Sequence, residues 1–303
     1  MKAPGFGLVV LFLPGLVLAQ PAPKAAPPTA RGEPETVYSE TQRQKDEQLS
    51  RRFVQSLLRP STKLEGQFAK WKHPICPRVT GMTQAATDAV EHRIRAVAKR
   101  IGAPLDRPDS CHPNIAVYVT PQPQATLDTL AAQEIRLFGG SPRRELKMRY
   151  PVQAWYFGYF VDFWGVRSYD GDQCWLRVLL ADPFCAGFGP QALDLVRTNL
   201  RPDMMAATIV VDAHAQTTLA SLADYIALMA LAQTPATGRC QPAPSIANLF
   251  LADCGTDLHT AGLSDADMAM LIALYQTPED PEKAQMGRLI ANMRRNLEGE
   301  TRK

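Results

Sequence analysis

The chain lacks the short motifs that identify the commonest catalytic mechanisms. It contains no HExxH zinc-binding helix, no GxSxG nucleophile elbow, no SxxK pair and no phosphate-binding P-loop. Its five histidines are scattered along the sequence, at positions 73, 92, 112, 214 and 259. Sequence motifs therefore give no reason to place the chain in any of these hydrolase or nucleotide-binding classes.

A charge excess of either sign is also missing. The chain has 33 lysine and arginine residues against 30 aspartate and glutamate residues. A nucleic-acid partner usually requires a concentrated basic face, so this near balance gives no reason to expect one. Long hydrophobic runs are scarce: after the first residues, no stretch approaches the roughly 20 apolar residues of a membrane span. The most apolar internal stretch, Ile226 to Ala232, predicts a core helix.

The N-terminus does contain an export signal. Lys2 precedes an apolar run from Phe6 to Leu18, and Ala19 is a small residue at a suitable cleavage position. A positive start, a short apolar core and a small residue before the cut are typical of a secretory signal peptide. We therefore predict a signal peptide at residues 1–19, no transmembrane anchor, and a periplasmic or secreted mature protein.

The mature chain is predicted to consist of a linker and one domain. Residues 20–45 begin with a run of proline and alanine, which cannot bury a core, and are expected to form a disordered tether. Residues 46–300 are enough for a single domain. Strand and helix patterns follow each other there without strict alternation, which favours an α+β fold with a mixed sheet and several packed helices.

The clearest predicted element is an amphipathic helix. Val90, Ile94, Val97 and Ile101 recur at helical spacing, and Gly102 is suited to end the helix. Further helices are predicted at 46–58, 124–138, 219–233, from 264 onward and at 281–297. Strands are predicted at 115–120, 152–164, 174–180 and 207–211, the second and third forming a hairpin around a turn at 170–172.

Six cysteines behind a signal peptide predict a disulfide framework that staples the domain. Favouring neighbours in sequence, we expect the pairs Cys76–Cys111, Cys174–Cys185 and Cys240–Cys254. The alternative is a zinc site, because His73 and His112 stand beside Cys76 and Cys111. Outside the cytoplasm the disulfide is the simpler interpretation, so neither a metal nor a cofactor is predicted.

Three polar residues are the candidates for a catalytic site. Asp224 is the charged residue of the apolar helix that begins at Leu219, and burying a carboxylate there is costly unless it is paired. Asp212 and His214 follow a predicted strand and would stand at its end. A structural ion pair is the favoured role for Asp224, and a polar surface is the favoured one for the other two residues.

Aromatic residues are concentrated between Tyr150 and Tyr169. In an extended strand they would occupy both faces, and a two-layer domain cannot easily bury both. One face would then be available to a partner, a glycan or a membrane surface, whereas a central strand covered on both sides is the alternative. The predicted binding residues are Trp155, Tyr156, Tyr159, Phe160, Phe163 and Trp164.

Several segments together resemble a family of predicted secreted proteins of Gram-negative bacteria that has no assigned activity. The resemblance spans roughly residues 50 to 297. The segments that carry it are Trp71 with Pro74–Pro77, Cys111–Asn114, Pro151–Tyr156, Leu222–Ala227 and Leu263–Asp267 with Leu274–Tyr275. This resemblance implies export and does not imply a reaction.

A more distant resemblance is to the layout of zincin-type metallopeptidases, in which a long helix follows a strand. Residues 223–227 would then stand where those enzymes carry HExxH. Ala223 and Ala227 would replace the two metal-binding histidines, and Asp224 the catalytic glutamate. The resemblance therefore implies a degenerate relative without zinc-peptidase activity.

Three functional hypotheses follow from the sequence. The first is a non-catalytic envelope protein that binds a protein or polymer partner through the aromatic segment. The second is a hydrolase with an unrecognised site at Asp212, His214 or Asp224. The third is a structural accessory module with neither role.

Overall fold

The computed structural model describes residues 33–59, 67–107, 111–134, 138, 146–162, 167–168, 200–234, 238–278 and 284–300. The chain divides into two compact units, Met1–Thr41 and Gln42–Lys303. In the first unit the described residues belong to the start of helix α1 (Glu33–Leu57), whereas the sheet and the other helices belong to the second unit. Among the described residues, no helix has both the length and the hydrophobicity needed to cross a bilayer.

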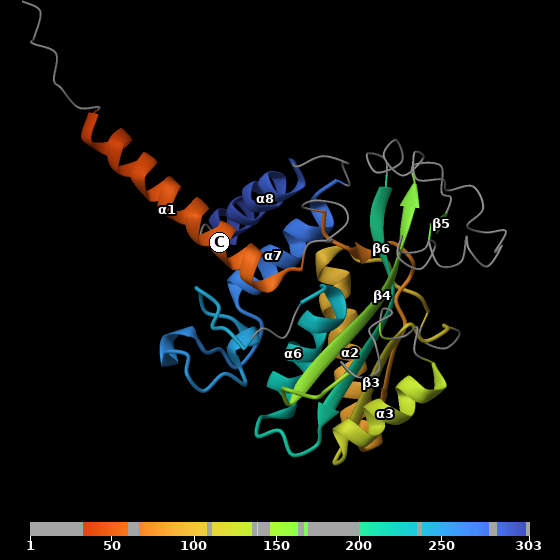
Figure 1. Cartoon of the computed structure of the whole chain (residues 1–303). Helices are drawn as coiled ribbons and strands as arrows, with labels where there is room; N and C mark the ends of the chain where they lie inside the picture. The colour runs from red at the N-terminus through yellow and green to blue at the C-terminus, as the bar shows by residue number, and fades with distance from the viewer. Residues whose placement is uncertain are drawn as a thin grey trace, which may run out of the picture. The chain divides into compact units, whose positions relative to one another are not determined.

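The second unit is built on a mixed, mainly parallel sheet (Figure 1). Its strand order is β2 (Pro77–Thr80), β3 (Ile115–Thr120), β6 (Leu200–Asp212), β4 (Val152–Asp162) and β5 (Arg167–Ser168). Strands β2, β3 and β6 are parallel, β4 is antiparallel to β6, and the short β1 (Lys70–Trp71) extends the parallel pairing along β6. The fold is therefore α+β with a mixed sheet, as the sequence predicts.

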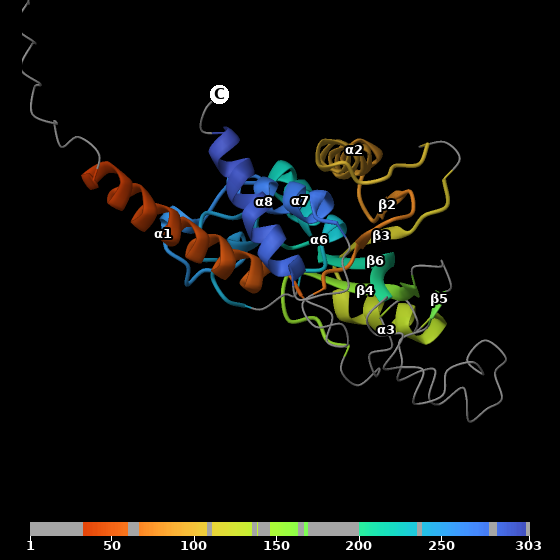
Figure 2. The same cartoon turned by 90° about the horizontal axis from the view of Figure 1, so that it is seen from above.

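Helices cover both faces of this sheet (Figure 2). One face carries α2 (Gln84–Ile101), α6 (Leu219–Leu231), α7 (Asp265–Gln276) and α8 (Ala284–Glu300), and the end of α1 adds Phe53 to the same core. The opposite face carries α3 (Pro123–Gln133) and a smaller core. The unit thus has three layers, with the sheet in the middle.

The α2 helix forms where the apolar stripe predicts it. Val90, Ile94, Val97 and Ile101 are all buried against the sheet and α6. The side chain of Thr83 accepts a hydrogen bond from the amide of Ala86 and caps the first turn. Gly102 ends the helix in the left-handed conformation, with φ 78°, which a residue without Cβ adopts at no steric cost.

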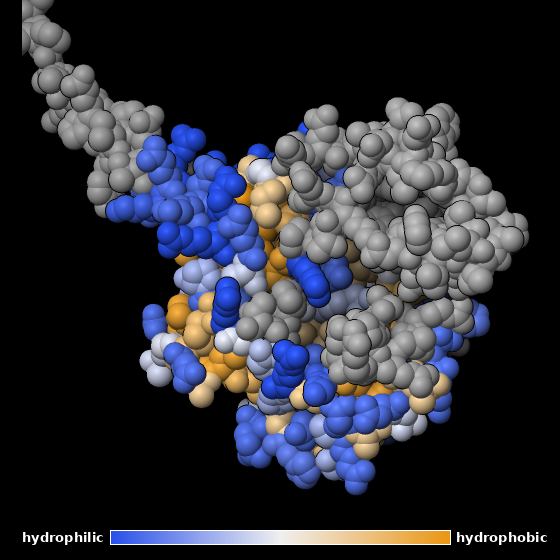
Figure 3. All heavy atoms as spheres, viewed as in Figure 1, coloured by the Kyte–Doolittle hydropathy of each residue, from blue (hydrophilic) through white to orange (hydrophobic). Residues whose placement is uncertain are grey.

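Helix α1 begins earlier than its hydrophobic pattern indicates. The chain is helical from Glu33, whereas the composition predicts a tether up to residue 45. The eight positions of the stretch 42–49 are all exposed, so this part has no apolar periodicity to reveal a helix. The side chains of Gln42 and Asp46, one turn apart, are instead joined by a 2.8 Å hydrogen bond. Figure 3 shows hydrophilic residues over this exposed part of the helix.

Several other elements begin or end at residues other than the predicted ones. Helix α3 stops at Gln133, and Phe138 beyond it packs edge-on against Trp155 with ring centroids 5.6 Å apart. Strand β6 begins at Leu200, before the predicted residue 207. Strand β4 pairs with β5 in antiparallel orientation, with Phe160 opposite Ser168; the predicted turn at 170–172 lies outside the described residues. The predicted strand 174–180 lies outside the described residues.

Two of the three predicted disulfides are present. Cys76–Cys111 joins the segment before β2 to the segment before β3, and Cys240–Cys254 closes a loop between α6 and α7. Their Cα–Cα distances are 5.8 Å and 5.5 Å, respectively. The predicted pair Cys174–Cys185 lies outside the described residues. Disulfides are consistent with an oxidising compartment such as the periplasm or the exterior.

Candidate functional site

Asp224 lies at the junction of three elements. It belongs to α6, and its carboxylate forms an ion pair with Arg93 of α2. The second oxygen, Oδ2, accepts a 3.2 Å hydrogen bond from the amide of Leu263 in the loop before α7. A Cβ on Gly262 would come within 2.7 Å of that oxygen, so this loop can approach so closely because residue 262 has no side chain.

These contacts give Asp224 a structural role. The residue is 8 % exposed, and each of its carboxylate oxygens has a donor. A general base needs a carboxylate that can reach and accept a substrate proton. A carboxylate that instead cross-links α2, α6 and the loop before α7 holds these elements in place.

Asp212 and His214 lie elsewhere, at the end of β6. The carboxylate of Asp212 accepts a 2.9 Å hydrogen bond from the backbone amide of His214, which closes a local turn. His214 is exposed, and its carbonyl accepts from the side chain of Gln216. Among the described contacts, no hydrogen bond or ion pair joins either residue to Asp224. The three candidates of the hydrolase hypothesis therefore form two separate features.

A fourth carboxylate, Asp267, is the most deeply buried of those described in this region. It is 0 % exposed and accepts hydrogen bonds from the Ser245 hydroxyl at 2.6 Å and from the Ile246 amide at 2.9 Å. It also accepts from the amide and the hydroxyl of Ser264, both at 3.0 Å, and so completes the capping box of α7. Burial raises the pKa of the Asp267 carboxyl above its ordinary value.

This network ties the 3₁₀ segment Ile246–Asn248 to the start of α7. The sequence predicts Asp267 as a favourable first-turn residue, and the serine three residues before it is the visible capping signal. Its second partner, Ser245, is distant along the chain and has no sequence signal. With four donors and no exposed surface, the Asp267 carboxylate stabilises the fold and cannot reach a substrate.

The zinc alternative loses two of its four ligands. Cys76 and Cys111 are joined in a disulfide, and a zinc site requires their free thiolates. In the described part of the chain no group of three or more histidine, cysteine or acidic side chains could hold a metal ion. Ala223 and Ala227, at the histidine positions of the zincin comparison, are buried in the core and offer no ligand atoms.

The aromatic segment begins inside the domain. Trp155 is 9 % exposed and packs between β4 and α3 with Leu127 and Phe138. The next side chain, Tyr156, points to the opposite face, where its hydroxyl donates to the carbonyl of Met229 in α6 at 2.9 Å. Burial raises the pKa of Tyr156 to about 12. The first half of β4 is therefore covered on both faces, which the third layer makes possible.

The other predicted binding residues follow this buried half. Tyr159 and Phe160 belong to β4, and Phe160 pairs through its backbone with Ser168 of β5, but their side chains are not described. Phe163 and Trp164 lie outside the described residues. The binding prediction consequently depends on these four, since Trp155 and Tyr156 contact the core.

A groove that the sequence does not reveal lies between the end of α1 and α8. It has a volume of about 270 Å³, and Leu49, Phe53, Met293 and Leu297 supply its apolar lining. Asp46 and Arg294 stand among the polar residues of its wall. Leu49 is 43 % exposed, so the groove could accept an apolar side chain, but it holds no set of converging polar groups for chemistry.

Comparisons with known proteins supply no relative. No family model, no curated protein and no solved structure matches the chain. The functional argument therefore depends on the residues and their geometry.

Proposed function

We propose that the chain is an exported, non-catalytic binding protein that takes an envelope protein or polymer on the aromatic residues Tyr159, Phe160, Phe163 and Trp164. The proposal has two supports. The carboxylates of Asp224 and Asp267 are engaged in structural contacts, and Phe163 and Trp164 lie in the sequence between two strands that pair with each other.

The proposal rests on the pairing of the two strands that come before and after Phe163 and Trp164 in the sequence. β4 ends at Asp162 and β5 begins at Arg167, and the two strands are antiparallel neighbours. Short connections between antiparallel strands commonly run over the surface of a protein. Large aromatic side chains in such a connection supply the amphipathic contact area on which binding sites commonly depend.

The architecture of β4 supports the same assignment. Trp155 and Tyr156 fix the first half of the strand from both faces. At Phe157 and Gly158 the register with β6 shifts, and a Cβ on Gly158 would come within 2.5 Å of the Asp203 carbonyl oxygen. The strand therefore has a rigid base that positions the following aromatic residues, which reduces the entropy lost on binding.

The test is capture of an envelope component by the mature chain and by a variant that combines Phe160→Ser, Phe163→Ser and Trp164→Ser. Isolated cell-wall sacculi and detergent-solubilised envelope extract serve as the two sources of ligand. We expect the wild type to bind one of them and the triple variant to lose at least about tenfold in affinity, because hot-spot aromatics each contribute about 2 kcal/mol or more.

A control variant removes an exposed hydrophobic side chain from a different element. Leu219, at the start of α6, is 40 % exposed, and Leu219→Ser should bind as the wild type does. Thermal unfolding must show that both variants remain folded. Equal affinity of the folded triple variant and the wild type would contradict the proposal.

A further inference from the structure

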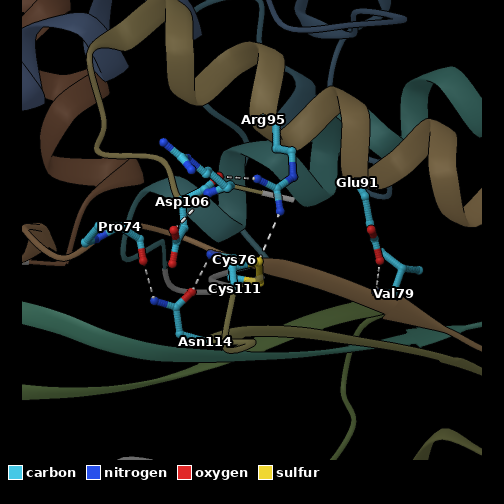
Figure 4. Close-up of a disulfide and its surroundings, with 9 residues drawn as sticks. Pro74, Cys76, Val79, Glu91, Arg95, Asp106, Cys111 and Asn114 are labelled. Atoms are coloured by element: carbon cyan, nitrogen blue, oxygen red, sulfur yellow. Dashed lines mark hydrogen bonds between the residues drawn. A yellow bond between two sulfur atoms is a disulfide. The ribbon is translucent and has the colours of Figure 1, made fainter. Parts of the chain in front are cut away.

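We propose that the Cys76–Cys111 disulfide is a thiol–disulfide exchange site, opened by an external dithiol that attacks the sulfur of Cys111. This proposal is independent of the aromatic segment. It depends on a cation that contacts one of the two sulfur atoms (Figure 4), and on the unequal exposure of the two cysteines.

The cation is Arg95, which projects from α2 over the disulfide. Its Nη2 donates a hydrogen bond to the Sγ of Cys111 at 3.4 Å, and its Nη1 donates to the carbonyl of Asp106 at 3.0 Å. The second bond fixes the guanidinium plane, so the charge stays beside the sulfur. A neighbouring arginine attracts an incoming thiolate to the sulfur that it contacts, and it stabilises the Cys111 thiolate that leaves when the mixed disulfide is resolved.

The two sulfur atoms differ in access. Cys76 is 1 % exposed, whereas Cys111 is partly exposed and is followed by the exposed His112. The backbone around Cys76 is held firmly, because its amide donates to the Asn114 side chain at 2.7 Å and its carbonyl accepts from the Asn114 amide at 3.1 Å. An external thiolate can therefore reach Cys111 and not Cys76.

The exchange proceeds in two balanced steps. A thiolate of the dithiol attacks Cys111 Sγ, the bond to Cys76 breaks, and Cys76 takes the electron pair and a proton. The second thiolate of the dithiol then attacks its own partner sulfur in the mixed disulfide, and Cys111 leaves as a thiolate beside Arg95. Two electrons pass to the protein, and the dithiol becomes a disulfide.

The Cys240–Cys254 disulfide supplies an internal reference. Its Cys240 is exposed, so an external thiol can reach this disulfide as well, and the two disulfides do not differ because one of them is inaccessible. In the described part of the chain, however, no cation donates a hydrogen bond to either of its sulfur atoms. Removal of the Arg95 charge should consequently change one disulfide and leave the other unchanged.

The experiment treats the oxidised, full-length mature chain with limiting dithiothreitol and traps free thiols by alkylation at successive times. Peptide mass spectrometry then gives the reduction rate of each disulfide separately. We expect Arg95→Gln to slow reduction of Cys76–Cys111 by about fivefold, the value of one charge-assisted hydrogen bond at a partly exposed site. Arg95→Lys should retain most of the wild-type rate.

The controls separate a local effect from a general one. Arg295→Gln removes the same charge from the exposed face of α8 and should alter neither disulfide. In the fully reduced chain, Cys111 should react with iodoacetamide faster in the wild type than in Arg95→Gln. An unchanged Cys76–Cys111 rate in Arg95→Gln would overturn the proposal, as would equal slowing of both disulfides.

Discussion

The two faces of the sheet differ in how their cores are built. On one face α2, α6, α7, α8 and the end of α1 form a thick layer, in which Ile226 and Leu228 of α6 are almost fully buried. On the other face, within the described residues, α3 covers a small cluster: Leu127, Ala131, Phe138, Leu146, Trp155 and Val210. The difference shows where stability is concentrated, and it explains why a strand can be aromatic on both sides.

Along strand β6, successive residues face the two different cores. Ile209 and Val211 face the thick layer, whereas Val210 between them faces α3. All three side chains are 0 % exposed. A strand segment that is buried on both faces is expected to be continuously hydrophobic, as Ile209–Val211 is.

The largest expected effect is a cavity in the thick layer. Ile226 is 0 % exposed and lies in α6 between the sheet and the outer helices. Ile226→Ala should lower the free energy of unfolding by about 4 kcal/mol, because the packed helices around it cannot move to fill the space. Urea denaturation of the wild type and the variant measures this loss.

The matching substitution on the thin face should cost less. Leu127 of α3 is also 0 % exposed, and Leu127→Ala removes a similar volume. We expect a loss of about 2.5 kcal/mol, because the small described core under α3 allows this helix to shift towards the sheet and partly close the cavity. If Leu127→Ala is as destabilising as Ile226→Ala in the same urea series, the two faces are equivalent and the contrast fails.

A smaller effect concerns pH and the bond between β4 and α6. The pKa of Tyr156 is raised from 10.0 to about 12 in the folded chain by burial. A raised pKa means that its contribution to stability is complete below pH 10 and is lost as pH rises towards 12. Between about pH 10 and pH 12, the free energy of unfolding should therefore fall by about 2 kcal/mol less in Tyr156→Phe than in the wild type.

Urea denaturation at about pH 8 and at successive pH values up to about pH 12 tests this sign. At neutral pH the variant should be about 1 kcal/mol less stable, because the Met229 carbonyl loses its donor. If the free energies of unfolding of the two proteins instead fall by the same amount as the pH rises, the Tyr156 hydroxyl is not protected by the α6 layer.

The sequence predicts those elements in which the spacing of apolar residues matches the spacing of the buried positions. The stripe of α2 and the run Ile115–Thr120 are recovered because their buried apolar residues recur at the helical and strand periods, respectively. The composition does not predict that Glu33–Lys45 is helical; of these residues, the described side chains at 42–45 are exposed and give no apolar periodicity. The end of α3 is missed as well, since Phe138 leaves the helix to pack on Trp155.

The candidate site is harder to predict because its partners are distant along the chain. The sequence identifies Asp224 as a carboxylate that needs a partner, but Arg93 and Leu263 are found only once α2, α6 and the loop before α7 are assembled. In the same way, alternation places Trp155 and Tyr156 on opposite faces of β4. Tyr156 is covered by α6 and Trp155 by α3. No local sequence pattern specifies that α3 packs on this face of the sheet.

Trp155 is packed in the core, and the proposed function requires that the aromatic residues after Asp162 are accessible to a partner. Acrylamide quenching of tryptophan fluorescence in the mature chain, compared with Trp155→Phe and Trp164→Phe, tests it most directly. The account predicts that Trp164→Phe removes a strongly quenched component, whereas Trp155→Phe removes a weakly quenched one. Equal protection of Trp164 and Trp155 from the quencher would contradict the account.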